Sequence, residues 1–140
     1  MPPGNCAAPD RSPRGFLPDE KKKLLCIDDE LIGLKIRKLI LERSGYEVLT
    51  AEDGPKGLEL FRAQDFHGVV LDYFMPGMDG GIVARQMKEI KPRIPILMLS
   101  AYFSLPDHAL DHVDAFITKG QSPEILLEKI RELVPKPNHG

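Results

Sequence analysis

Short apolar runs alternate with segments of helical periodicity along residues 21–134, and this alternation restricts the fold more than any other feature of the chain. Strands buried on both faces are almost continuously apolar. Four such runs are present, at 24–27, 69–71, 96–99 and 115–117. Tyr46, Val48 and Thr50 alternate with polar residues instead, which predicts a fifth strand nearer a sheet edge. Strands separated by helices are typical of βα units, so we expect a three-layer α/β domain around a parallel sheet.

Apolar residues recur at helical spacing between the strands, which predicts helices that turn these residues toward the core. The stripes are Ile32, Ile36, Leu39 and Ile40; Leu58 and Phe61; Val83, Met87 and Ile90; and Leu126, Ile130, Leu133 and Val134. Gly45 is expected to end the first helix, and Ser122 to cap the last one. The first strand is expected at 23–28 and the last helix at 123–134. A further short helix is predicted at 105–112.

The two ends of the chain differ in composition from the middle. Residues 1–20 hold five of the thirteen prolines and show no periodicity, which predicts a flexible arm. Residues 135–140 are expected to form a short tail. No apolar run approaches the roughly 18 residues that a membrane span needs, and the apolar stretch of a secretory signal is missing. We therefore expect a cytoplasmic, free-standing domain at 21–134.

Charge and cysteine content disfavour two classes of function. Nineteen basic and 21 acidic side chains provide no broad basic field, so nucleic acid is not an expected partner. The two cysteines do not form a CxxC pair, which argues against a zinc site. His108 and His112 have the i, i+4 spacing of a helical metal site, but the sequence offers them no third ligand.

Polar side chains follow the predicted strands at the points where the strands end. These residues are Asp28, Asp29 and Glu30 after the first strand, Asp72 after the third, Ser100 after the fourth, and Thr118 and Lys119 after the fifth. Ligands of open parallel sheets bind outside the carboxyl ends of the strands. Taken singly, each residue has an ordinary structural explanation, such as a helix cap. Their joint placement instead predicts one crevice that holds three carboxylates, a hydroxyl and an ammonium group.

Such a crevice suits phosphoryl chemistry. Three neighbouring carboxylates repel one another unless a cation lies among them, and hard oxygen ligands suit Mg²⁺. An aspartate beside a metal ion and a lysine is a known type of nucleophile, which forms an aspartyl-phosphate. The residues therefore indicate a Mg²⁺-assisted phosphoryl acceptor.

These residues resemble the receiver domain of two-component response regulators. The resemblance rests on Asp28 with Asp29, on the block LDYFMPGMDG at 71–80, on Ser100 and on Lys119, and it covers residues 21–134. It implies a flavodoxin-like (βα)5 sandwich with a five-stranded parallel sheet in the order 2-1-3-4-5.

The resemblance also implies a role for each site residue. Asp72 would accept a phosphoryl group from a phosphohistidine of a sensor histidine kinase or histidine phosphotransfer protein. Asp29 and Asp72 would bind Mg²⁺ directly, Asp28 largely through water, and the backbone carbonyl of Phe74 would be a further ligand. The chain would then carry only self-phosphorylation and dephosphorylation chemistry and would not be an enzyme.

Two further positions complete the implied switch. Ser100 would bond a phosphoryl oxygen and Lys119 would pair with the phosphoryl charge. Phe116 would turn inward as the Ser100 hydroxyl moves. The expected output is a contact with an unknown downstream protein, made by a monomer or weak dimer.

The sequence departs from this family in three ways. Gly120 replaces the proline that usually follows the lysine, and the 19 positions from Ser100 to Lys119 leave little room for a helix. Phe74 and Tyr102 place two bulky aromatics where the family controls access of water to the phosphoryl group, which predicts slow hydrolysis.

Two alternatives stay open. A degenerate receiver would dock partners without taking phosphate, and Gly120 favours that hypothesis. A Mg²⁺-dependent phosphatase with Asp72 as nucleophile is the other. Its common pattern has a second aspartate two residues later, where this chain has Phe74.

Overall fold

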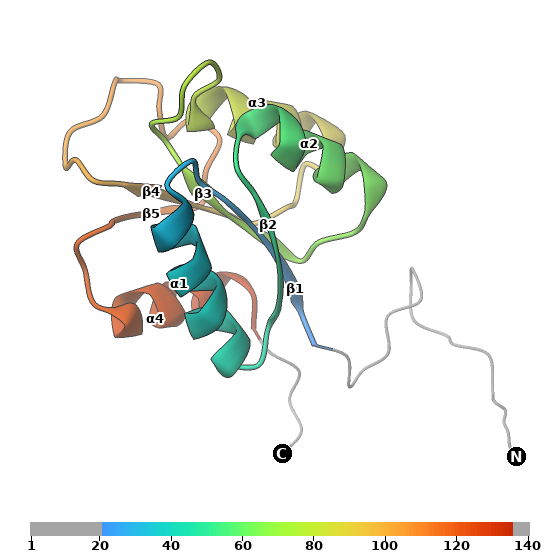
Figure 1. The fold of residues 1–140 in the computed structure, drawn as a ribbon. Coiled ribbons are helices and arrows are strands. Elements are labelled where there is room, and N and C mark those ends of the chain that lie inside the picture. The colour runs from blue at the N-terminus through green and yellow to red at the C-terminus, as the bar shows by residue number, and fades with distance from the viewer. Residues whose placement is uncertain (1–20, 136–140) are drawn as a thin grey trace, which may run out of the picture.

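A five-stranded parallel sheet lies between two pairs of helices in the computed structural model, which describes residues 21–135 (Figure 1). The elements are β1 (Lys23–Ile27), α1 (Leu31–Arg43), β2 (Glu47–Ala51), α2 (Gly54–Ala63), β3 (Gly68–Asp72), α3 (Gly80–Ile90), β4 (Ile96–Ser100), β5 (Ala115–Thr118) and α4 (Pro123–Leu133). The strand order is β2-β1-β3-β4-β5, which confirms the flavodoxin-like class and the edge position of the second strand. The predicted arm at 1–20 and tail residues 136–140 lie outside the described residues.

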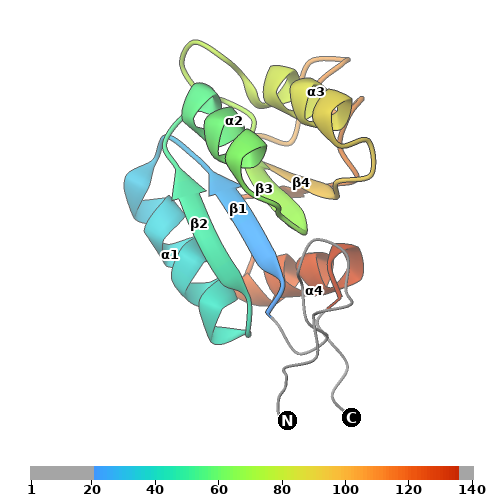
Figure 2. The same ribbon diagram turned by 90° about the vertical axis from the view of Figure 1, so that its right-hand side faces the viewer.

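Each face of the sheet has its own apolar cluster. Helices α1 and α4 cover one face, and α2 and α3 cover the other (Figures 1 and 2). Along β1, Leu24 and Cys26 join the cluster beneath α1 and α4, whereas Leu25 and Ile27 join the one beneath α2 and α3. This burial on both faces explains why the central strands are continuously apolar.

Short polar side chains fix where α2 and α3 begin. Asp53 accepts a hydrogen bond from the Lys56 N–H at 2.8 Å at the start of α2. Asp79 does the same for Ile82 at 3.0 Å and so starts α3 directly after the loop that follows β3. Gly45, at φ 101°, follows the end of α1 as expected. The Asp79 cap thus ends the loop that follows Asp72.

The predicted core face of α1 is wrong. Ile32, Ile36 and Leu39 are exposed. Of the predicted stripe only Ile40 packs on the core, and Leu34 and Leu41 are buried instead. Apolar residues surround most of this helix, so periodicity alone allowed two stripes. Packing against β1 and β2 selects the Leu34 face and leaves the other stripe in solvent.

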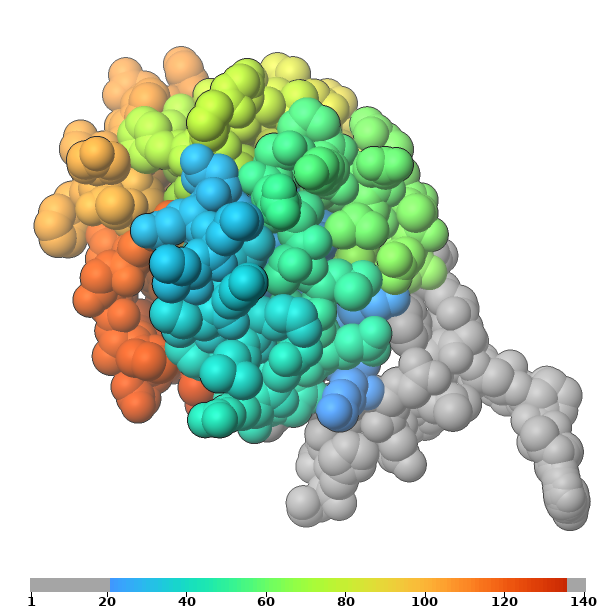
Figure 3. Space-filling model, in the orientation of Figure 1, coloured from blue at the N-terminus to red at the C-terminus, as the bar shows by residue number. Residues whose placement is uncertain are grey.

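The helix predicted at 105–112 is absent. Residues 101–114 (orange in Figure 3) join β4 to β5 through bends and isolated turns, such as the hydrogen bond from the Ala109 N–H to the Pro106 carbonyl at 3.0 Å. Ala109 is the one residue of this stretch that is fully buried. A short helix in water needs an apolar face packed on the core, and this segment supplies almost none.

The remaining boundaries differ from expectation by one residue. β1 ends at Ile27 rather than at 28, and α4 ends at Leu133 rather than at 134. Among residues 21–135, none of the helices has the length and apolar character needed to cross a membrane.

Candidate functional site

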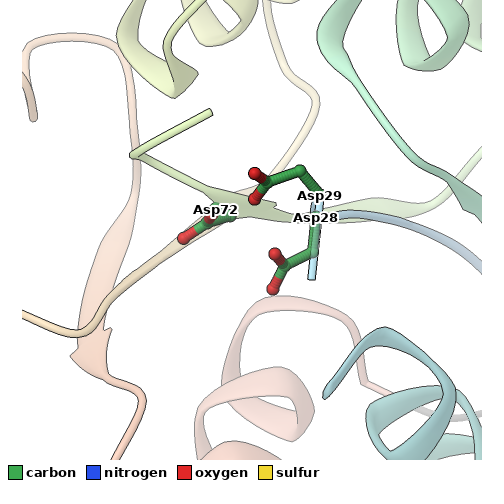
Figure 4. Close-up of side chains that lie close together, drawn as sticks. All are labelled: Asp28, Asp29 and Asp72. Atoms are coloured by element: carbon green, nitrogen blue, oxygen red, sulfur yellow. The ribbon is translucent and has the colours of Figure 1, made fainter. Parts of the chain in front are cut away.

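Three carboxylates meet at the carboxyl ends of β1 and β3 (Figure 4). Asp28 and Asp29 directly follow β1, and Asp72 is the last residue of β3. The two strands are hydrogen-bonded neighbours, so their ends lie side by side. One oxygen from each carboxylate lies within 4.8 Å of the others. Asp28 and Asp72 are 1% and 3% exposed, and Asp29 is exposed.

Lys119 brings a positive charge to these carboxylates from the end of β5. Its Nζ lies 2.9 Å from Asp28 Oδ2 and 3.2 Å from Asp72 Oδ1. Its backbone N–H donates to the Ser100 carbonyl at 2.8 Å, which ties the residue to β4. Burial acts to lower the pKa of Lys119, but its bonds to Asp28 and Asp72 outweigh this effect and raise the pKa. Lys119 is therefore a stable cation in the site.

The charge of Lys119 does not offset the effects that raise the pKa of Asp72. Burial, followed by the charge of Asp28, raises the pKa of Asp72 to about 6, even though Lys119 acts in the opposite direction. A cation among the three carboxylates would relieve this repulsion. The donor set consists of hard carboxylate oxygens from Asp28, Asp29 and Asp72, which fits Mg²⁺.

Ser100 lies at the end of β4, next to β3 in the sheet. It is fully buried, and its Oγ accepts a hydrogen bond from the Tyr102 N–H at 3.0 Å. Phe116 in β5 is partly buried and packs on the cluster beneath α2 and α3. The fold thus brings Ser100 to the strand-end edge, while the switch roles of Ser100 and Phe116 stay predictions.

Aromatic rings form a row across the loops that follow Asp72 and Ser100. The Phe74 ring contacts Tyr73 edge-on at 4.7 Å between centroids, and its other neighbour is Tyr102. Phe74 follows Asp72 by two residues and its ring is half exposed. The Phe74 carbonyl as a metal ligand stays a prediction. Within residues 21–135, no cluster of three potential metal ligands includes His108 or His112.

Sequence reasoning missed one charged residue of the site. The Arg37 side chain reaches from the middle of α1 and pairs with Asp28 Oδ2. Periodicity did not reveal it, because Arg37 lies three residues after Leu34 and four before Leu41, on a face of α1 that the sequence pattern did not identify as the buried one. A cation on a buried helix face needs a partner.

A cavity of about 310 Å³ opens beside this pair, between α1 and α4. Its lining includes Glu30, Gly33, Arg37 and Lys119 together with apolar side chains of both helices. The cavity therefore adjoins the acidic cluster from the side of α1.

Residues 24–131 match the family described as the response regulator receiver domain. Among curated proteins, a probable transcriptional regulator ycf27 of Cyanophora paradoxa is 37% identical over 117 residues, which are 81% of this chain and 48% of that protein. The alkaline phosphatase synthesis transcriptional regulatory protein PhoP of Bacillus subtilis is 34% identical, over 81% of this chain and 48% of its own length. The chain thus spans about half the length of these relatives.

Solved structures show the same likeness. The response regulator TrrA of Thermotoga maritima, solved with Mg²⁺-BeF, has a TM-score of 0.77 and 33% identity, and the match covers 80% of this chain and 98% of that one. TrrA in complex with the histidine kinase ThkA gives a TM-score of 0.75 at 32% identity, over 81% and 98%. A CheY-like receiver protein of Methanospirillum hungatei gives 0.77 at 33%, over 81% and 93%.

Proposed function

This chain belongs to the response regulator receiver domain family of two-component signal transduction, and on that basis we propose that it accepts a phosphoryl group on Asp72 from a phosphohistidine. The observation that carries the proposal is the buried Asp72 carboxylate between two aspartates and a lysine. We place the receiver domain at residues 21–134, in the cytoplasm, acting as a monomer or weak dimer.

The proposed step is an in-line displacement at phosphorus. A carboxylate oxygen of Asp72 forms the new P–O bond while the P–N bond to the donor imidazole breaks. The imidazole leaves with the bonding electron pair and takes up a proton, and Asp72 becomes an acyl phosphate. Even without a metal ion, a pKa of about 6 means that Asp72 is mostly ionised at neutral pH, as a nucleophile must be.

The other side chains handle the charge that this step creates. Lys119, 3.2 Å from Asp72 Oδ1, pairs with the incoming phosphoryl oxygens. Asp28, Asp29 and Asp72, with the Phe74 carbonyl, would hold Mg²⁺. When bound, that ion would neutralise charge on the carboxylates and the phosphoryl group.

Ser100 and Phe116 would supply the switch. Ser100 Oγ now accepts the Tyr102 N–H. We propose that its hydroxyl turns to the phosphoryl group and that Phe116 then moves inward. The change would alter the face formed by β5 and its neighbours, which a downstream protein would bind.

The exposed side of α1 is the proposed contact surface for the phosphodonor. Ile32, Ile36 and Leu39 form an apolar stripe along α1, and Ile32 is 75% exposed within four residues of Asp28 and Asp29. An apolar helix face suits docking against helices of a partner. TrrA, one of the similar structures, was solved with a histidine kinase, which supports a partner of that kind.

Incubation with acetyl phosphate and Mg²⁺, followed by intact mass measurement, tests the proposal. The wild type should gain one phosphoryl group, and Asp72→Asn should gain none. Asp107→Asn, the same change at an exposed aspartate, is the matched control and should label like the wild type. Failure of the wild type to label with any donor would favour the docking module. Steady release of phosphate from many turnovers would favour the phosphatase.

A further inference from the structure

Two cations meet on one oxygen of Asp28. Lys119 Nζ lies 2.9 Å from Oδ2, and the Arg37 guanidinium pairs with the same atom. The other oxygen, Oδ1, accepts the Glu30 N–H at 2.9 Å. Both carboxylate oxygens of a 1% exposed aspartate are therefore already engaged by groups of this chain.

The position of Arg37 makes this pairing stronger than a surface ion pair. Its side chain is only 13% exposed, and it extends from the buried face of α1. Charges screened so little by water interact more strongly than exposed ones. A divalent cation that binds at Asp28 must therefore compete with the guanidinium that is already paired with this carboxylate.

Gly33, which has no side chain, leaves room for Arg37 to extend toward Asp28. A Cβ on Gly33 would lie 3.4 Å from both terminal nitrogens of Arg37 and 3.1 Å from Glu30 Oε1. Such a Cβ would already touch the guanidinium, so glycine at this position gives Arg37 room to reach Asp28. The cavity between α1 and α4, lined in part by Arg37 and by the carboxylate-bearing Glu30, offers the guanidinium a second position away from Asp28.

We propose that Arg37 is a tethered counter-cation of the acidic site. In the metal-free chain it neutralises Asp28, and it gives up Asp28 when Mg²⁺ binds. Arg37 thereby sets the Mg²⁺ concentration at which the site fills. This inference rests on the magnesium site of the proposed function and adds a residue that competes with the ion.

Calorimetric titration of the whole chain with MgCl₂ tests the competition. Arg37→Gln keeps a hydrogen-bond donor but removes the charge, and we expect it to bind Mg²⁺ roughly tenfold more tightly than the wild type. Lys35→Gln is the matched control, because it removes the same charge from an exposed position on the same helix. It should bind within about twofold of the wild type.

Thermal unfolding supplies a second readout that needs no phosphorylation. In EDTA, Arg37→Gln should melt lower than Lys35→Gln, and saturating Mg²⁺ should remove most of that difference. Equal losses with and without Mg²⁺ would identify a merely structural ion pair and overturn the inference.

The remaining outcomes are equally distinct. If Arg37→Gln does not fold, Arg37→Met removes the charge but keeps the apolar part of the side chain on the buried face of α1, and the same gain in Mg²⁺ affinity is expected. Unchanged or weaker affinity in the folded variant would overturn the inference alone. Absence of Mg²⁺ binding in both wild type and variants would overturn the magnesium site itself and the inference with it.

Discussion

The ring of Phe74 lies edge-on against the ring of Tyr102, with 5.2 Å between their centroids. Phe74 follows the proposed phosphoryl acceptor by two residues, and Tyr102 follows Ser100 by two, so the pair joins the loops on both sides of the site. We expect the two rings together to restrict the path by which water would reach a phosphoryl group on Asp72.

We therefore expect Phe74→Ala and Tyr102→Ala to shorten the lifetime of the phosphorylated protein, each by roughly tenfold, which corresponds to about 1.4 kcal/mol in the barrier to hydrolysis. Decay of the phosphorylated mass after removal of acetyl phosphate measures this lifetime. Phe103→Ala is the control, because that ring is 87% exposed. A lifetime unchanged in both variants would refute the role of the aromatic pair.

We expect the charged Asp72 carboxylate to destabilise the metal-free protein at neutral pH. Its pKa is raised from 3.8 to about 6, first by burial and then by Asp28. A raised carboxyl pKa means that the folded state binds the proton more tightly, so stability rises as pH falls from about 6 toward 3.8. Asp72→Asn removes the charge and should raise the free energy of unfolding at pH 7 in EDTA by about 1–3 kcal/mol.

Urea unfolding across this pH range checks the prediction. The advantage of Asp72→Asn should shrink toward pH 4, where the wild-type carboxyl becomes protonated, and Asp107→Asn should show no such advantage. A variant less stable than the wild type at pH 7 would contradict the assigned cause of the shift.

The meeting of the acidic residues at one edge of the sheet was predictable, because the carboxyl ends of parallel strands lie at the same edge. Once Asp28 and Asp72 stand at the ends of neighbouring parallel strands, their side chains must share one edge of the sheet. The residue-level pattern was enough to place Lys119 there too. The strand order came from the resemblance, since periodicity reveals which segments are strands but not which ones pair.

Three features could not be predicted from the sequence pattern. The buried face of α1 depends on packing, because apolar residues surround most of that helix. The path of residues 101–114 depends on how little apolar surface they bury. The contact of Arg37 with Asp28 depends on a side-chain direction across nine residues, which no periodicity encodes.

The apolar stripe on α1 leads to a prediction that separates two kinds of donor. One donor is a phosphorylated histidine protein that labels the wild type. Ile32→Glu should lower the rate of transfer from this donor by tenfold or more, which corresponds to a loss of about 1.4 kcal/mol of docking energy. Acetyl phosphate needs no docking, so its labelling rate should stay within about twofold. Leu110→Glu, at an exposed leucine between β4 and β5, is the control. Equal effects on both donors would indicate damage to the site rather than to docking.

Gly80 holds the loop after β3 against the strand that carries Asp72. Its N–H donates to the Tyr73 carbonyl at 2.8 Å, and a Cβ there would lie 2.5 Å from the Asp72 carbonyl oxygen and 2.9 Å from the Tyr73 Cα. These neighbours are backbone atoms, so they cannot move aside without shifting Asp72. Gly80→Ala should therefore lower the free energy of unfolding by about 1–3 kcal/mol, more than the gain in helix propensity returns.

The same backbone shift should slow labelling of Asp72 by acetyl phosphate, so one variant links the packing of α3 to the chemistry of the site. Gly120→Ala is the matched control, because a Cβ at Gly120 meets nothing within 4 Å and its stability should stay within about 0.5 kcal/mol of the wild type. The free energy of unfolding, measured with urea, and the labelling rate should both be lower in Gly80→Ala, and neither should be lower in Gly120→Ala. If Gly80→Ala matched Gly120→Ala in both measurements, the close approach of Gly80 to Asp72 would have no part in positioning the carboxylate.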